Sequence, residues 1–252
     1  MKSLMIRLRA LAYPPDGPFD RDFRKTYFIL RQCIGGLGLL VPIVLVGAGL
    51  INDIPWSQMG SISAFYWLSP TTAPTGLLRD FFVGPLSAVG VCLIIYKGYG
   101  DLEDWLLNCA GGALLSVAFF PMAWPPSQEH TPQFTVHFSV HDTAAVSFFL
   151  LIAATVWLCA GTTLGNLTPE EQKRWIRWYR LLAILMAVAP LAAWALATRG
   201  HQTLMVEMAG IGVFSGYWFL KTYELQYVSR LEPKEGQAPE LERVEGIIRR
   251  LS

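Results

Sequence analysis

Six apolar runs, separated by shorter polar connections, determine the architecture that the sequence predicts. A helix needs about 20 mainly apolar residues to cross the hydrocarbon core of a bilayer, and the runs are close to that length. We therefore predict an all-α polytopic membrane protein with one transmembrane domain, residues 26–221. Its six transmembrane helices are expected over residues 28–51, 80–97, 103–123, 138–161, 178–197 and 203–220.

The segments outside these runs are amphipathic or rich in aromatic residues. Residues 1–25 and 222–252 carry apolar side chains at helical spacing among charges, which is typical of helices that lie on a membrane surface or on a partner. The connection 52–79 is long and holds four aromatic residues. Such a connection is expected to fold against the membrane or the bundle instead of extending into solvent.

The basic residues predict the orientation of the bundle. All but two of the 20 lysines and arginines lie on one side of the predicted bundle. They lie before or at the start of the first span, between the second and third spans, around the connection between the fourth and fifth spans, or from Lys221 onward. Only Arg79 and Arg199 lie on the opposite side. Short loops rich in lysine and arginine stay in the cytoplasm, so we expect both termini to be cytoplasmic.

The composition fits this class and excludes another. Hydrophobic residues make up 53% of the chain and charged residues 15%, whereas soluble domains have roughly 25% charged residues. The formal net charge of +1 leaves no concentrated basic face, so we expect no nucleic-acid partner. The four cysteines lie in or at the ends of apolar runs without CxxC spacing, which indicates no disulfide framework.

Chemistry-bearing side chains gather at the predicted outer end of the bundle. All four histidines fall there, and His137 and His141 lie four residues apart on one helix face. Glu207 interrupts an apolar run, where an ionised group needs a partner. We predict an outer polar pocket whose ligand-binding residues are Ser63, Arg79, Asp80, His137, His141 and Glu207.

Each of these groups also has a simpler interpretation. A carboxylate in the first turn of a helix, such as Asp80 or Asp142, gains about 0.3–1 kcal/mol from the helix dipole without any ligand. Glu207 could be a structural tie to Arg79, Arg199 or a serine. The two histidines could be satisfied interfacial side chains. The metal alternative is zinc held by His137, His141 and Asp80, and a haem between histidines of two helices is a further alternative.

Several segments resemble a family of uncharacterised bacterial six-helix integral membrane proteins, over about residues 35–220. They are Ser61–Tyr66, Arg79–Gly84, Tyr96–Tyr99, Phe120–Pro121, and His141 with Ala144–Ala145 and Phe148–Phe149. The resemblance implies the six-helix fold and a multi-pass location in the bacterial inner (cytoplasmic) membrane. It implies no settled activity.

A weaker resemblance is to the membrane hydrolases typified by alkaline ceramidases. In that family a serine and a histidine four residues apart, an aspartate on the next helix and an HxxxH pair build a zinc site. Ser63, Asp80, His137 and His141 match those residue types. Trp67 occupies the first histidine position, the HxxxH pair comes mid-chain, and the helix count is lower than in that family.

The leading functional prediction is therefore a membrane protein whose outer polar pocket binds a small ligand or a lipid headgroup, or which serves as an accessory subunit of a membrane complex. Its expected partners are the lipid bilayer and either a membrane-protein complex or a second copy of the chain. The alternative is a metal-dependent membrane hydrolase of a lipid-like substrate. A transporter ranks third because we expect the spans to lack paired internal charges.

Overall fold

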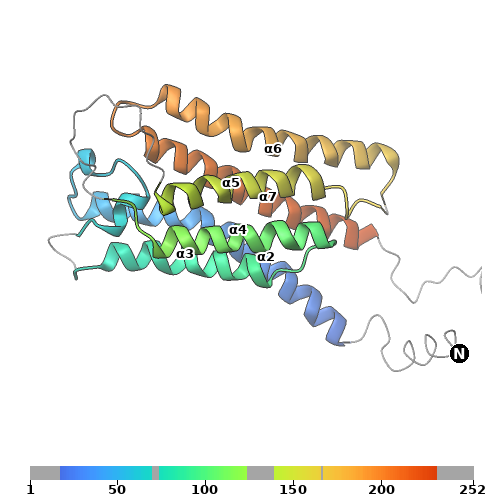
Figure 1. Cartoon of the computed structure of the whole chain (residues 1–252). Coiled ribbons are helices and arrows are strands. Elements are labelled where there is room, and N and C mark those ends of the chain that lie inside the picture. The colour runs from blue at the N-terminus through green and yellow to red at the C-terminus, as the bar shows by residue number, and fades with distance from the viewer. Residues whose placement is uncertain (1–17, 70–73, 124–138, 166, 232–252) are drawn as a thin grey trace, which may run out of the picture.

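The computed structural model describes residues 18–69, 74–123, 139–165 and 167–231. Within these residues the fold consists of six long α-helices and two short 3-10 helices, without a strand (Figure 1). The α-helices are α2 (Pro18–Ile51), α3 (Leu77–Ile95), α4 (Asp101–Phe119), α5 (Val140–Cys159), α6 (Pro169–Leu196) and α7 (Gln202–Leu231). The predicted all-α class is confirmed.

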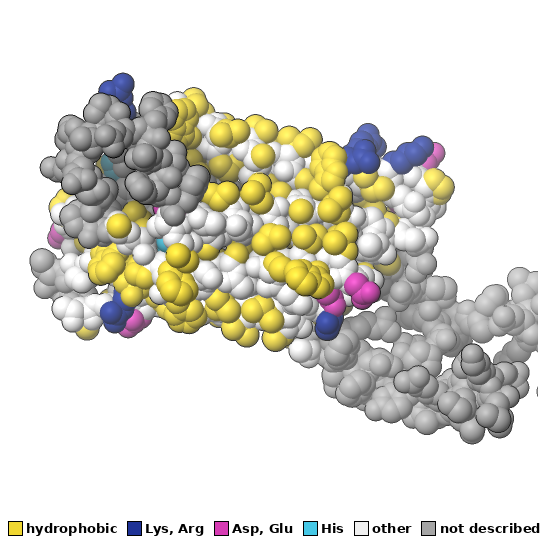
Figure 2. Space-filling model, in the orientation of Figure 1, with side chains coloured by type: hydrophobic (Ala, Val, Ile, Leu, Met, Phe, Trp, Pro, Cys, Tyr) yellow, Lys and Arg dark blue, Asp and Glu magenta, His cyan; other side chains and the backbone are white. Residues whose placement is uncertain are grey.

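Five of these helices are long and apolar enough to cross a membrane, namely α3, α5, α6, the Lys25–Ile51 part of α2 and the Gln202–Val228 part of α7. Helix α4 also has 19 residues, but its first turn contains three acidic side chains, which lower its mean hydropathy. Figure 2 shows hydrophobic side chains over the middle of the bundle and charged ones toward its two ends. This is the architecture of a multi-pass membrane protein.

The six helices form a closed ring. Each helix packs against the next one along the chain, and α7 returns to pack against α2. Close approach of α3 and α4 depends on small residues, since a Cβ atom on Gly111 would lie 2.5 Å from the Gly90 carbonyl oxygen. The described chain begins and ends at the same end of the ring (Figure 1). We call this the base end.

The opposite end is closed by residues 52–69, here called the cap. The cap contains the 3-10 helices η1 (Trp56–Gln58) and η2 (Ser63–Tyr66). Its buried apolar side chains share a core with α2, α3 and α7, and they are Ile54, Met59, Ile62, Phe65 and Leu68. The Leu204 amide of α7 also donates to the Gly60 carbonyl at 2.9 Å. The described part of the 52–79 connection is therefore folded against the bundle, as predicted.

Two of the helices, α2 and α7, extend well beyond the predicted spans at the base end. Residues 18–25 belong to α2, although we assigned them to a surface segment, and α7 continues to Leu231 instead of ending near residue 220. A helix can continue through charged residues because its hydrogen bonds are made by its own backbone. The other residues of the two predicted amphipathic segments, 1–17 and 232–252, lie outside the described part of the chain.

Candidate functional site

Three elements bring polar side chains together beneath the cap. Ser63 begins η2, His141 lies in the first turn of α5, and Glu207 lies in the second turn of α7. The start of α5 is fixed by a capping box in which the Ser139 hydroxyl accepts from the Asp142 amide and the Asp142 carboxylate accepts from the Ser139 amide. This capping box holds His141 at the end of the bundle, where the His141 side chain is buried.

The Glu207 carboxylate accepts hydrogen bonds from three groups of the cap. The Ser61 hydroxyl lies 2.8 Å from Oε2, the Ile62 amide 2.6 Å from Oε2, and the Ser63 hydroxyl oxygen 2.9 Å from Oε1. All three are neutral groups, so no described cation offsets the carboxylate by direct contact. Glu207 therefore ties α7 to the cap through serines, which was one of the interpretations that the sequence left open.

His141 extends this network toward α4. Its Nδ1 lies 2.9 Å from the carbonyl oxygen of Phe120, the residue that ends α4, and its Nε2 lies 3.0 Å from Ser63 Oγ. A carbonyl oxygen can only accept, so Nδ1 carries a proton and donates it. Ser63 is the shared partner, because its hydroxyl group contacts both His141 and Glu207.

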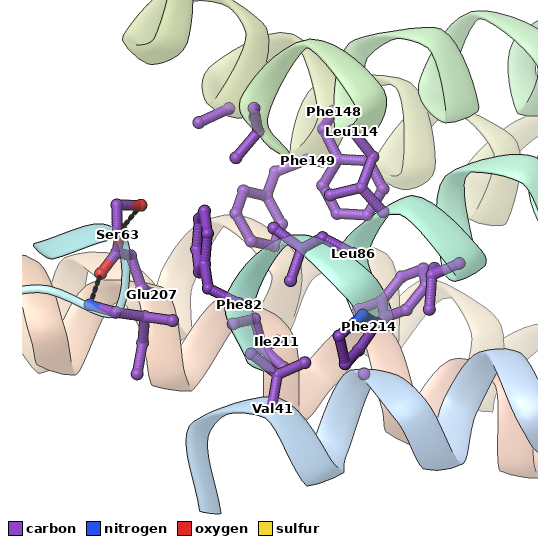
Figure 3. A pocket seen from close by; sticks show the side chains of 16 residues that line it. Val41, Ser63, Phe82, Leu86, Leu114, Phe148, Phe149, Glu207, Ile211 and Phe214 are labelled. Carbon is purple, nitrogen blue, oxygen red and sulfur yellow. Dashed lines mark hydrogen bonds between the residues drawn. The ribbon is translucent and has the colours of Figure 1, made fainter. Parts of the chain in front are cut away.

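A cavity of about 80 Å³ borders this network. Among its 16 lining residues only Ser63 and Glu207 carry polar side chains, and Figure 3 shows both at one end of the cavity. In this measure one water needs about 10–15 Å³, so there is room for a small ligand. The other lining residues are Gly38, Val41, Ile62, Phe82, Pro85, Leu86, Val89, Leu114, Val117, Ala145, Phe148, Phe149, Ile211 and Phe214.

Two of the predicted site residues lie apart from this network. Arg79 and Asp80, in the first turn of α3, form an exposed ion pair with a nitrogen–oxygen distance of 3.5 Å. Their side chains are 51% and 73% exposed, which leaves them on the surface while His141 is buried. The structure thus brings together Ser63, His141 and Glu207 of the predicted set, and it does not join Arg79 or Asp80 to them.

The predicted metal ligands are only partly within the described residues. His137, like His130, lies outside them, and the exposed Asp80 shares no contact with His141 in the described part of the chain. No group of three or more His, Cys, Asp or Glu side chains suited to a metal ion occurs among the described residues. His201 is buried and hydrogen-bonds the Trp56 carbonyl at 2.9 Å, so it fastens the cap.

Sequence reasoning missed three partners in this network and a second network at the base end. Ser61, the Ile62 amide and the Phe120 carbonyl were not among the predicted ligand-binding groups, although Ser61 and Phe120 lie in segments that carry the first family resemblance. Two of these partners are backbone groups, whose hydrogen bonds do not depend on residue type. At the base end, Lys221 and Glu224 form a buried ion pair at 3.1 Å within α7. This pair lies just beyond the predicted span 203–220, but inside the Gln202–Val228 part of α7 that is apolar enough to cross a membrane.

No protein-family model, curated protein or solved structure matches this chain. Both family resemblances therefore stay predictions.

Proposed function

We propose that this protein binds a small, mainly apolar ligand in the cavity beneath the cap, with a hydrogen-bonding end of the ligand directed at Ser63 and Glu207. The proposal rests on one observation: an apolar cavity of about 80 Å³ whose two polar lining side chains lie together at one end. Such a lining, with a few convergent polar groups, is the usual composition of small-molecule sites.

The surrounding helices suit a ligand that arrives through the membrane. Five α-helices and the cap contribute lining residues, while α6 contributes none. Apolar side chains cover the outside of the same bundle, for example Leu40, Leu150 and Leu191, each more than half exposed. An apolar ligand concentrated in lipid would therefore meet the protein at high local concentration.

The hydrolase alternative gains no support from the described residues. Ser63 is only 4% exposed, and its hydroxyl group is already engaged by His141 and Glu207. A nucleophile needs access to a reacting carbonyl as well as an adjacent base. Binding without covalent chemistry is the simpler function for this geometry.

A cavity-filling substitution tests the proposal. Ala145→Leu adds three carbon atoms to the cavity lining, whereas Ala192→Leu makes the same change on the exposed surface of α6. In detergent, 1-pentanol should raise the Tm of the wild type and of Ala192→Leu more than pentane does, because only the alcohol has a hydroxyl end. Ala145→Leu should lose this difference. An unchanged difference in Ala145→Leu would place alcohol binding elsewhere.

We also propose that all six helices cross a bacterial inner membrane, with the cap outside and both termini in the cytoplasm. The support is the distribution of lysine and arginine, together with a described chain that begins and ends at the base end. In a background without Cys33, Cys92, Cys109 and Cys159, single cysteines at Ser127 and Thr198 should react with an impermeant reagent added to intact cells. Cysteines at Thr168 and Ser252 should react only after lysis, and the reverse pattern would invert the proposed orientation.

A further inference from the structure

The hydrogen bonds beneath the cap form a single chain that links a backbone carbonyl to a carboxylate. Phe120 O lies 2.9 Å from His141 Nδ1, His141 Nε2 lies 3.0 Å from Ser63 Oγ, and Ser63 Oγ lies 2.9 Å from Glu207 Oε1. Each contact is within hydrogen-bonding distance, so each needs a proton between its two atoms. These contacts therefore fix the number of protons that His141, Ser63 and Glu207 hold together.

A neutral histidine and an ionised glutamate supply one proton too few. The Nδ1 proton of His141 is committed to the Phe120 carbonyl, which leaves Nε2 as a bare acceptor. The single hydroxyl proton of Ser63 can then point to His141 or to Glu207, but not to both. In either case one contact would place two lone pairs about 3 Å apart, which is repulsive. One additional proton satisfies both contacts.

We propose that Glu207, Ser63 and His141 form one proton-binding site that shares this additional proton. In one arrangement it lies on His141 Nε2, which donates to Ser63 Oγ, while the Ser63 hydroxyl donates to the ionised Glu207. In the other arrangement Nε2 gives its proton to Ser63 Oγ as the original hydroxyl proton passes to Glu207 Oε1. Neutral Glu207 then donates to Ser63, and Ser63 donates to neutral His141. The number of protons and the net charge are the same in both.

No other charged side chain within the described residues contacts this chain of groups. At the cap end, α3 contributes the exposed Arg79–Asp80 pair, and α5 contributes Asp142, which caps its own helix. The start of α7 contributes His201, which is bonded to the Trp56 carbonyl. Asp53 and Arg199 lie in exposed or partly exposed connections, and the charged residues of α2 and α4 lie toward the base end. The shared proton is therefore exchanged between Glu207 and His141 alone.

This proton-binding site lies at the polar end of the cavity and extends the proposed function. The number of protons that the site needs does not depend on a ligand. Glu207 and Ser63 line the cavity, and His141 lies behind them toward α4. Shifting the proton changes the Glu207 carboxyl group from an acceptor of the Ser63 proton into a donor to Ser63, without changing the charge of the site. The carboxyl oxygens of Glu207 can accept from a hydroxyl end of a ligand in both arrangements, and the site can pass a proton from Glu207 through Ser63 to His141.

Two serine variants give a matched test. Ser61→Ala and Ser63→Ala each remove one hydroxyl group that contacts Glu207, but only Ser63 also contacts His141. The full chain, with ¹⁵N-labelled histidine, is titrated with acid and base in lipid bilayers. NMR reports the two ring nitrogens of His141, identified by loss of the signal in His141→Asn. Infrared difference spectra report the carboxylic acid of Glu207, identified by loss of the signal in Glu207→Gln.

The proposal predicts a common midpoint for the His141 and Glu207 signals in the wild type, Ser61→Ala and Ser63→Thr, because coupled groups titrate as one unit. The two midpoints should separate in Ser63→Ala, and the His141 step should vanish from the same pH range in Glu207→Gln. Throughout, Nδ1 should remain protonated. Midpoints more than about one pH unit apart in the wild type, or a His141 tautomer with a bare Nδ1, would overturn the shared proton. Failure of pentanol binding would leave this result unaffected, so the two proposals can fail separately.

Discussion

Polar networks lie inside both ends of the bundle, and they differ in how their charges are balanced. At the cap end the Glu207 carboxylate is held by three neutral donors. At the base end Lys221 donates to Glu224 at 3.1 Å and to the Thr163 hydroxyl oxygen at 2.7 Å. Glu224 also accepts from the Tyr179 and Thr163 hydroxyls. The base end therefore contains a completed ion pair, and the cap end does not.

A second buried cation at the base end is held mainly by aromatic rings. The guanidinium of Arg31 lies 4.6 Å from the centre of the Tyr27 ring and 5.1 Å from that of Tyr96. Its Nη2 also donates to the Tyr96 hydroxyl, and its Nε has no hydrogen-bond partner among the described residues. Cation–π contacts of this kind stabilise a desolvated cation by about 2 kcal/mol.

The difference between the two ends fits a structural role for the base-end network and the proposed binding role for the cap-end network. Arg31, Lys221 and Glu224 are all buried, and none of them lines the cavity. Lys221 and Glu224 are paired with each other, and Arg31 lies against aromatic rings, which suits a structural connection between α2, α6 and α7. Glu207 and Ser63 line the cavity and depend on a shared proton instead of a fixed cation. Only the cap-end network can therefore change its hydrogen bonding when a ligand enters.

The largest effect that this comparison predicts is on Glu224. Glu224→Gln keeps the shape of the side chain but removes the carboxylate that contacts the buried Lys221 ammonium group. The other buried acidic neighbour of Lys221, Glu103, forms no ion pair with it among the described residues. Breaking a buried ion pair in this way should lower the free energy of unfolding by about 3–5 kcal/mol. The measurement is denaturant-induced unfolding in detergent micelles. A loss below 1 kcal/mol would mean that Lys221 and Glu224 are not an ion pair in the folded protein.

Glu207→Gln is the matched control at the cap end. Its amide group can donate to Ser63 and accept from the Ile62 amide, which reproduces the arrangement with a neutral Glu207. The free energy of unfolding should therefore change by only about 1 kcal/mol.

A double variant, Lys221→Met with Glu224→Leu, should recover much of the loss caused by Glu224→Gln, because replacing both charges removes the desolvation cost.

Much of the fold was predictable because the bilayer imposes a length on each apolar run. The all-α class followed from those runs, and the packed cap followed from the aromatic residues of the 52–79 connection. Helix bounds at the base end were not predictable in the same way, since α7 runs on past Lys221 with charges that its own neighbours satisfy. Apolar length marks the membrane-spanning part of a helix and not its end.

The candidate site was predictable in its residue types and not in its pairings. His141 and Glu207 were visible as polar side chains in or next to apolar runs. Their link through Ser63 joins residues 78 and 144 positions apart in the chain, which depends on how the cap folds over α5 and α7. Asp80 looked equivalent to His141 by its place in a first turn, but the side chain of a first-turn residue can face either the bundle or the surface.

The smallest predicted effect concerns an exposed ion pair at the same end as Lys221 and Glu224. Lys97 Nζ lies 2.8 Å from Asp104 Oδ2, and the Lys97 side chain is 78% exposed. The hydrogen bond to Asp104, followed by the charge of that carboxylate, raises the pKa of Lys97 above its usual value of 10.5. A raised pKa in the folded state means that the stabilisation is complete below about pH 10.5 and is lost as the pH rises through the folded-state pKa.

Lys97→Met should therefore lower the Tm slightly at pH 8, and the difference from the wild type should shrink above the ordinary lysine pKa of 10.5. High salt should also reduce it, because an exposed pair is screened by solvent ions and contributes little. Lys173→Met is the control, since Lys173 is an exposed lysine for which the described residues show no ion pair. It should change the Tm without this dependence on pH. Lys97→Met should lower the stability much less than Glu224→Gln does. If the two losses were equal, solvent exposure would not distinguish the two ion pairs. Burial would then not explain why the Lys221–Glu224 pair is expected to contribute most to the stability of the base end.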